Sequence, residues 1–250
     1  DKLDSNIATT TINMPWAPVV DLDGSLSSGR NHITTFTEGV GGANGTAVAI
    51  AYSNAGLTDQ DGNIASVTVA LTNHPDGGSE SLNVDASLVT TLTGLGITTT
   101  GNGSHSITFS GNADSTYFQL ALRSVKYLNT SQNPDVTQRV VTVSALDVSS
   151  NPSVSAQTTI NITPVNDAPV IGDGDRAATL LEGALYTLTA PGDLNPSDVD
   201  DSAASLKYMV TTVPANGTLF RDANYNNEAD SGEILAATAG AGVITSFLRS

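Results

Sequence analysis

The stretch TTINITPVNDAPV, from Thr158 to Val170, recurs in shorter form near the N-terminus, where Thr10 to Val19 reads TTINMPWAPV. In both copies polar and apolar residues alternate up to a proline, and the chain then restarts at Ala-Pro-Val. Alternation with a period of two predicts a strand with one buried face, and a proline directly after it cannot join a central ladder. A strand, a stiff joint and a new strand, used twice, indicate tandem β-modules.

The repeat predicts how the 250 residues are divided. We expect a lead-in strand or linker over 1–16, a first module over 17–167 and a second over 168–250, because the length suits two ordinary domains. The second module is short and has no counterpart of the strand that ends at Thr163. Either the sequence stops inside this module or its closing strands come from elsewhere.

Abundant Gly, Thr, Ser and Asn, without long helical periodicity, predict an all-β fold. One short helix is expected after Asp114, which would cap it, because Tyr117, Leu120 and Ala121 follow helical spacing. The strands expected in the first module are 33–37, 46–51, 64–71, 106–109, 125–128, 136–146 and 153–163. Those expected in the second are 178–181, 185–188, 206–213, 217–220, 233–236 and 243–247.

The charge and the composition exclude several classes of partner. With 25 acidic and 9 basic residues the chain has a net charge of −16, which argues against nucleic acid and against an anionic membrane surface. No cysteine is present, so disulfides and thiolate metal sites are excluded. No apolar run is long enough to span a bilayer, so we expect no direct membrane insertion. The start shows no secretory leader, so we expect a mature fragment or an excised piece.

Acidic and amide groups recur at matching places in the two modules. The groups are Glu38-Gly39 and Glu182-Gly183, Asp59-Gln60-Asp61 and Asp198-Val199-Asp200, Asp147 after a predicted strand, and Asn166-Asp167 at the joint. An Asp-x-Asp turn directs its oxygens to one side, which suits Ca²⁺ with its about six to eight oxygen ligands. For a single such turn a solvated turn is the better interpretation, since Asp, Asn and Gly favour turns. The same order in two modules favours calcium.

These features resemble a known family. Glu-Gly in the first strand, Asp-x-Asp in an early loop, a late Asp and VNDAP at 165–169 resemble cadherin-like modules, and more closely the cadherin-like repeats of large bacterial RTX-type surface adhesins and biofilm proteins. The runs LALRSVKYLNTS at 120–131 and VTTVPANGTL at 210–219 resemble those repeats too. The resemblance covers nearly the whole chain and implies tandem Ig-like, cadherin-like Greek-key β-sandwich modules.

The resemblance also implies metal ligands, because in that family calcium ions lie between consecutive modules and make the rod rigid. It implies a joint site built by Glu38, Asn166, Asp167, Asp198 and Asp200. It implies that Asp59, Asp61 and Asp147 serve the N-terminal end of the first module. At that end the chain departs from the family pattern, because the joint is only Pro15-Trp16; Asp21 or Asp23 would have to substitute.

A second calcium signal does not depend on the joint. Oxygen-bearing residues occupy positions 1, 3, 5, 7, 9 and 12 of a twelve-residue loop, as in an EF-hand: Asp222, Asn224, Asn226, Glu228, Asp230 and Glu233. Position 7 would bind through its backbone carbonyl. Asn227 takes the place of the usual glycine at position 6 and tolerates a left-handed backbone better than most residues. Flanking helices are not expected, so the loop would lie between strands; otherwise it is a polar hairpin loop.

Catalysis has little support, and we expect no enzyme. The three histidines (His32, His74 and His105) show no triad or metal spacing, and no nucleophile elbow, phosphate loop or dinucleotide fingerprint is present. The sequence favours an extracellular, calcium-stiffened extender in a bacterial surface adhesin, a monomer whose partners are the neighbouring modules of the same chain. The alternative is a calcium-dependent module that binds a surface glycan or peptide, for which Tyr225 and Trp16 are the only suggestive aromatic residues.

Overall fold

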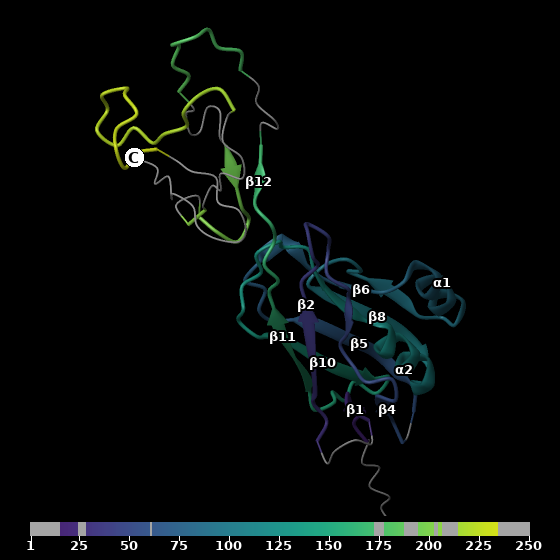
Figure 1. Ribbon diagram of the computed structural model, residues 1–250. Helices are drawn as coiled ribbons and strands as arrows, with labels where there is room; N and C mark the ends of the chain where they lie inside the picture. The colour runs from purple at the N-terminus through teal and green to yellow at the C-terminus, as the bar shows by residue number, and fades with distance from the viewer. Residues whose placement is uncertain are drawn as a thin grey trace, which may run out of the picture. The chain divides into compact units, whose positions relative to one another are not determined.

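The computed structural model describes residues 16–24, 29–60, 62–172, 178–187, 195–202, 205–206 and 215–234. The chain separates into two compact units, residues 1–165 and 166–250. The boundary follows Val165, inside the VNDAP stretch that the sequence suggested as the joint. Strands dominate the described residues and helices are few and short, so the fold is all-β (Figure 1).

Unit 1 is a β-sandwich built on a six-stranded mixed sheet (Figure 1). The order is β2 (His32–Thr37), β11 (Ala156–Thr163), β10 (Arg139–Asp147), β5 (Ile64–Leu71), β8 (Ser106–Ala113) and β7 (Thr98–Thr100). β2 and β11 are parallel, and the other neighbours are antiparallel. A three-stranded sheet of β3 (Val48–Ala49), β9 (Lys126–Asn129) and β6 (Glu80–Asn83) contributes to the same core. The pair β1 (Val19–Asp21) and β4 (Gly56–Thr58) completes the unit.

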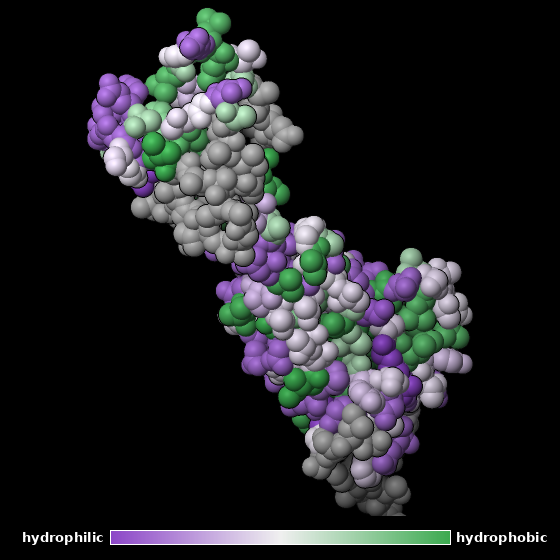
Figure 2. Space-filling view, viewed as in Figure 1, coloured by the Kyte–Doolittle hydropathy of each residue, from purple (hydrophilic) through white to green (hydrophobic). Residues whose placement is uncertain are grey.

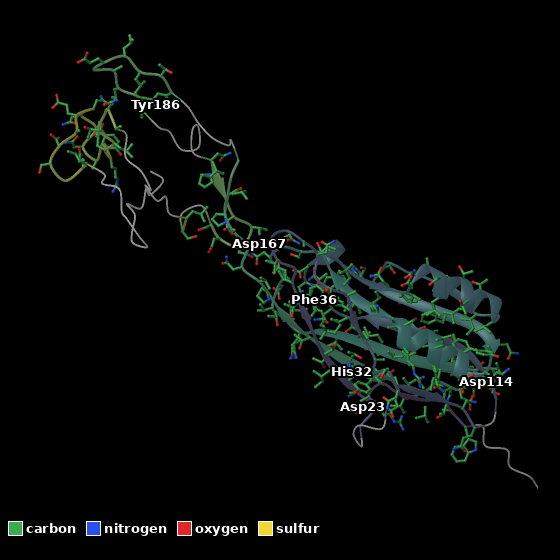
Figure 3. The ribbon with its side chains drawn as sticks, turned by 45° about the vertical axis from the view of Figure 1, so that its right-hand side comes forward. Asp23, His32, Phe36, Asp114, Asp167 and Tyr186 are labelled. Carbon is green, nitrogen blue, oxygen red and sulfur yellow. The ribbon has the colours of Figure 1, made fainter. Side chains whose placement is uncertain are left out.

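The core follows from strict alternation along the strands. β10 buries every second residue from Arg139 to Asp147, and β11 does the same from Ala156 to Ile162. Phe36 of the large sheet meets Tyr127 of the small sheet edge to face, with ring centroids 5.5 Å apart, a geometry that aromatic quadrupoles favour. Figure 3 labels Phe36 within unit 1.

The opposite, outward face of the large sheet carries no charged and no aromatic residue. Outside the bulge near Ala65, the outward residues are Ile33, Thr35, Thr37, Gln157, Thr159, Asn161, Thr163, Val140, Thr142, Ser144, Leu146, Ser66, Thr68, Ala70, Ser106, Thr108, Ser110, Asn112, Thr98 and Thr100. All of them are exposed or half-buried.

The described part of unit 1 contains two α-helices, where the sequence predicted one. The expected helix is α2 (Ser115–Ser124), and the Asp114 side chain caps it by accepting a hydrogen bond from the Thr116 amide at 2.9 Å (Figure 3). The second, α1 (Ala86–Gly94), contradicts the expectation of a single helix. Its Val and Thr content lowers helix propensity, so the segment had the appearance of a loop. Asp85 at its N-cap and Leu88 and Leu92 at i,i+4 spacing were the missed signals.

Most predicted strands of the first module occur, the one over 46–51 only as the two-residue β3, whereas four short strands were missed. β5 begins and ends where predicted, and β2, β8, β9, β10 and β11 fall within a few residues of their predicted ranges. The missed strands are β1, β4, β6 and β7, none longer than four residues. A segment of this length has too few residues to display a period of two, so only its pairing defines it.

One buried charged network crosses unit 1. Arg139 is fully buried; its guanidinium donates to Glu80 Oε2 at 3.0 Å and to Asp76 Oδ2 at 2.6 Å. The Tyr127 hydroxyl also donates to Glu80 Oε2, at 2.9 Å, and Asn129 Nδ2 donates to Asp76 Oδ2 at 2.7 Å. Burial, followed by the charge of Glu80, raises the pKa of Tyr127 above its usual range. The 3-10 turn Gly77–Ser79 lies between the two carboxylates in sequence.

Unit 2 shows little regular structure in its described residues. β12 (Val170–Ile171) pairs antiparallel with β13 (Pro196–Ser197), and Phe220 forms an isolated bridge with Ile234. The predicted strand over 178–181 is wrong, as is the described part of the one over 185–188, because these residues lie in turns or irregular backbone. The predicted strand over 243–247, most of the one over 206–213, the last two residues of the one over 233–236, and the lead-in up to residue 15 lie outside the described residues. In the described part of the chain, no helix is long and apolar enough to cross a membrane.

Candidate metal sites

The start of unit 2 folds onto its Asp-x-Asp turn. Val170 pairs with Ser197, directly before Asp198. The Asp198 Oδ1 accepts the amides of Asp200 and Asp201 at 2.8 and 3.0 Å, so the turn is closed by its own first carboxylate. Asp200 Oδ2 in turn accepts the Asp167 amide at 2.6 Å, and Asp167 is only 7% exposed. Of the predicted joint ligands, Asp167, Asp198 and Asp200 are therefore brought together within unit 2 (Figure 3 labels Asp167).

The start of unit 1 has the same pairing. Val19, in the first Ala-Pro-Val, pairs with Thr58, directly before Asp59. In each unit the valine of Ala-Pro-Val thus lies opposite the residue that precedes the first Asp of the Asp-x-Asp turn. This matching register ties together two sequence features, the repeated joint and the repeated acidic turn, that are far apart in the chain.

Of the ligands predicted for the N-terminal end of unit 1, Asp147 is engaged by its own turn. It is 2% exposed, and its carboxylate accepts the Asn151 amide at 2.7 Å and Asn151 Nδ2 at 2.8 Å. Burial raises its pKa, but the hydrogen bonds from Asn151 and from the Ser149 amide outweigh burial, and the net pKa is lowered. Asp59 is half-buried, and Asp61 lies outside the described residues.

A carboxylate pair that the sequence offered only as a substitute lies at the end of β1. Asp21 Oδ1 accepts the amides of Asp23 and Gly24 at 3.2 and 3.1 Å. Burial, then the hydrogen bond and the negative charge of Asp23, raise the pKa of Asp21. Burial lowers the pKa of His32, and Asp23 partly opposes this. Figure 3 shows Asp23 and His32 at the same end of unit 1, a proximity that the sequence did not reveal.

Glu38 lies where β11 ends. Its amide donates to the Thr163 carbonyl at 3.0 Å and its Oε2 accepts the Val165 amide at 2.9 Å, so it holds the last residues of unit 1. The side chain is buried, at 4% exposure, and borders a groove of about 370 Å³ beside β2 and β3. Glu182, its sequence counterpart in unit 2, is exposed. That Glu38 shares an ion with unit 2 stays a prediction.

The twelve-residue loop closes between extended segments rather than helices. Arg221 N donates to the Glu233 carbonyl at 2.9 Å, beside the Phe220–Ile234 bridge. Asn227 has φ = 63°, the left-handed conformation that the sequence predicted for position 6. Tyr225 is also left-handed, at φ = 63°. Two left-handed residues fold the chain tightly enough for the loop to turn back on itself.

Side chains at positions 1, 3, 5, 9 and 12 of this loop point into its interior. Asp222 accepts the Asn226 and Asn227 amides at 3.1 and 3.0 Å, and Glu233 Oε1 accepts the Ala223 amide at 2.8 Å. Asp230 Oδ2 accepts Asn224 Nδ2 and Asn226 Nδ2, both at 2.8 Å. A half-turn of either amide group would present its oxygen in place of its nitrogen. The carboxylates of positions 1, 9 and 12 are half-buried, whereas Glu228 at position 7 is exposed.

Within the described ranges, no three His, Cys, Asp or Glu side chains gather closely enough to form a metal site by themselves. The carboxylates above are directed at backbone amides and Asn side chains instead. The donor set is nonetheless all oxygen, and it includes Asn side chains and the Glu228 carbonyl, which accepts the Asp230 amide at 3.2 Å. Such a set fits a hard cation and does not suit zinc, which prefers nitrogen and sulfur.

The two aromatic residues that the sequence singled out are both exposed. Tyr225 is 80% exposed at the tip of the loop, and Trp16 is 59% exposed next to β1.

No family model matches the chain, and no curated protein and no solved structure matches it significantly.

Proposed function

We propose that this chain is a calcium-binding pair of extracellular β-modules that acts as a stiff extender in a bacterial surface adhesin. The observation that carries the proposal is the matching register of the two unit starts, in which Ala-Pro-Val lies beside an Asp-x-Asp turn. Nothing constrains a turn that is only solvated to recur at the same place relative to the joint. A ligand site reused in each module is constrained to recur at that place.

The mechanism we propose is the removal of repulsion. Asp198 and Asp200 are held one residue apart, and Asp200 holds the Asp167 backbone. The like charges of neighbouring carboxylates repel one another, by roughly 1 kcal/mol for a pair about 4 Å apart in bulk water. A bound divalent cation would reverse that sign, and the same residues would then hold the first residues of unit 2 in place.

The loop from Asp222 to Glu233 would supply a second, separate site. Its carboxylates at positions 1, 9 and 12 would bind through side chains, together with the amide oxygens of Asn224 and Asn226 and the Glu228 carbonyl. A site in the loop would stiffen unit 2 itself, because it links Phe220 and Ile234 across the hairpin.

The test is a thermal melt of the chain in excess chelator and in calcium, with small-angle scattering in both states. We expect calcium to raise the melting temperature and to give a stiffer, more elongated particle, while magnesium at the same concentration has a smaller effect. Asp198→Asn should remove part of the gain, and Asp201→Asn, the same change three residues further along, should not. Identical melts and scattering curves in both conditions would refute the proposal.

A second function has one specific observation in its favour. Tyr225 is 80% exposed at the tip of the candidate loop, where an aromatic face would be available to a sugar ring or a peptide. In this alternative the loop with its ion is a recognition surface. Glycan-array binding in calcium that Tyr225→Ser abolishes would support this alternative. If the chain binds no glycan and no peptide surface, the extender is the remaining candidate function.

A further inference from the structure

The outward face of the six-stranded sheet differs from the rest of this acidic protein. Each outward position from β2 to β7 holds an uncharged residue, although the chain has 34 charged residues and a net charge of −16. No described element covers this face, since its residues remain exposed or half-buried. In the view of Figure 2, pale residues of intermediate hydropathy lie on unit 1 among hydrophilic (purple) and hydrophobic (green) ones.

Hydroxyl groups form rows across this face. Ser144, Thr68, Thr108 and Thr100 lie opposite one another on four successive strands, and Thr68 Oγ1 is 3.4 Å from Thr108 Oγ1. Strand geometry places neighbouring hydroxyls within a row about 4.8 Å apart, on adjacent strands. Successive rows lie about 6.7 Å apart along the strands. Each hydroxyl both donates and accepts hydrogen bonds, so the array is complementary to a copy of itself.

The charge distribution indicates which partner binds this face. Two copies with net charge −16 repel one another through any acidic surface, whereas this face brings no charged side chain into the contact. A cationic partner would prefer the acidic turns, and a flat sugar surface would prefer aromatic residues, of which the face has none. We propose that two copies of this chain associate weakly, face to face, through the outward surface of the six-stranded sheet.

The area of the face predicts how strongly two copies associate. Six strands of about five residues cover roughly 500 Å² per copy, or about 1,000 Å² for the pair. Stable complexes bury about 1,200–2,000 Å², so the association is weak and operates where copies are concentrated side by side. At ordinary dilution the chain is a monomer, as the sequence suggested.

The test is sedimentation equilibrium of the full chain from roughly 10 µM to roughly 1 mM, with chelator present throughout so that the result does not depend on calcium. Dimers should form with increasing concentration. Raising the salt from about 0.01 M to about 1 M shortens the screening length from about 30 Å to about 3 Å. Association should therefore strengthen with salt, because repulsion between the two acidic chains is screened.

Matched variants locate the contact. Thr68→Lys places a charge at the centre of the face and should weaken association at least about tenfold, even though it lowers the net negative charge. Thr90→Lys makes the same change at a position of α1 away from this face and should have no such effect. Ser110→Lys, at an exposed position of the neighbouring strand, gives a second variant in case Thr68→Lys fails to fold, which circular dichroism checks.

Three outcomes would overturn the proposal. They are a monomer at every concentration, equal weakening by Thr90→Lys and the two face variants, and association that weakens as salt rises. A soluble uncharged polysaccharide such as dextran that binds the face of a strictly monomeric chain would also overturn it, by assigning the surface to a different partner.

Discussion

The two units carry the same net charge but differ in size and in which residues they bury. Unit 1 has 13 acidic and five basic residues and unit 2 has 12 and four, so each is at −8, but unit 1 has 165 residues and unit 2 has 85. Every buried hydrophobic residue in the described part of the chain belongs to unit 1. The buried residue described in unit 2 is Asp167, a carboxylate.

The difference suggests two separate sources of stability. Unit 1 buries an apolar core and neutralises its innermost charge internally, through Arg139 with Glu80 and Asp76. Unit 2 has about twice the density of net charge, and its acidic residues gather in turns. The first source needs no ion. If unit 2 binds calcium as proposed, a cation that binds only the folded state would add to the second source by mass action.

The largest effect should come from the buried ion pair of unit 1. Glu80→Gln leaves the fully buried Arg139 with Asp76 as its nearest remaining carboxylate, so unit 1 should lose about 3–5 kcal/mol of unfolding free energy. Urea unfolding followed by tryptophan and tyrosine fluorescence measures the loss. The same loss is expected in calcium and in chelator. A loss that calcium restores would contradict the separation of the two stability sources.

Calcium itself should produce the next largest effect, and chiefly in unit 2. At about one hundred times the dissociation constant, each site adds about 2.7 kcal/mol to the folded state that binds it. Hydrogen exchange followed by mass spectrometry resolves the units: protection should rise around 195–202 and 215–234, and change little in β5, β8 and β10. Uniform protection across both units would show that the two stability sources are not separate.

Within the loop, two glutamates allow a sharper comparison. Glu233→Gln removes the carboxylate of position 12 and should weaken loop binding by about 1.5–3 kcal/mol, roughly ten- to hundredfold. Glu228→Gln removes the same charge from position 7, where the backbone carbonyl is the expected ligand, and should leave affinity nearly unchanged. Isothermal titration measures both. Equal losses of affinity would show that the loop attracts calcium through its overall negative charge rather than through ligands at defined positions.

A smaller effect is expected at Asn227. At φ = 63° an Asn to Gly change relieves backbone strain, and Asn227→Val increases it by about 1–2 kcal/mol. Calcium affinity of the loop should therefore follow the order Gly, Asn, Val. No dependence on residue 227 would mean that the bound loop abandons this conformation.

The smallest effect concerns the stability of unit 1 at low pH. The pKa of Asp147 lies below its usual value of 3.8 in folded unit 1, so folding favours its charged form. The stabilisation is complete above the usual pKa and is lost as the pH falls through the lower, folded value. Asp21, with its raised pKa, works in the opposite direction. Urea midpoints near pH 7 and pH 3 should therefore differ less in Asp147→Asn than in wild type, while Asp85→Asn, at an exposed position, behaves as wild type. An unchanged difference in Asp147→Asn would contradict the assignment.

Local patterns were enough for the strands that carry the core. β5 and β11 are long and alternate over most of their length, so hydrophobic periodicity alone located them, and the Asp114 cap located α2. The left-handed position of Asn227 followed from its place in a ligand spacing. Each of these depends on residues within a few positions of one another, and sequence records such neighbours directly.

Contacts between distant segments required the tertiary structure. The pairing of Val19 with Thr58, the ion pairs of Arg139 with carboxylates 59 and 63 positions away, and the proximity of Asp23 to His32 follow from register and packing. The uncharged face likewise exists only because strand order sets Ser144, Thr68, Thr108 and Thr100 in one row. The sequence determined the longer strands of unit 1 and where acidic and amide side chains are concentrated. The fold alone decided which of those side chains and surfaces share a side, because a sheet joins residues by pairing rather than by their separation along the chain.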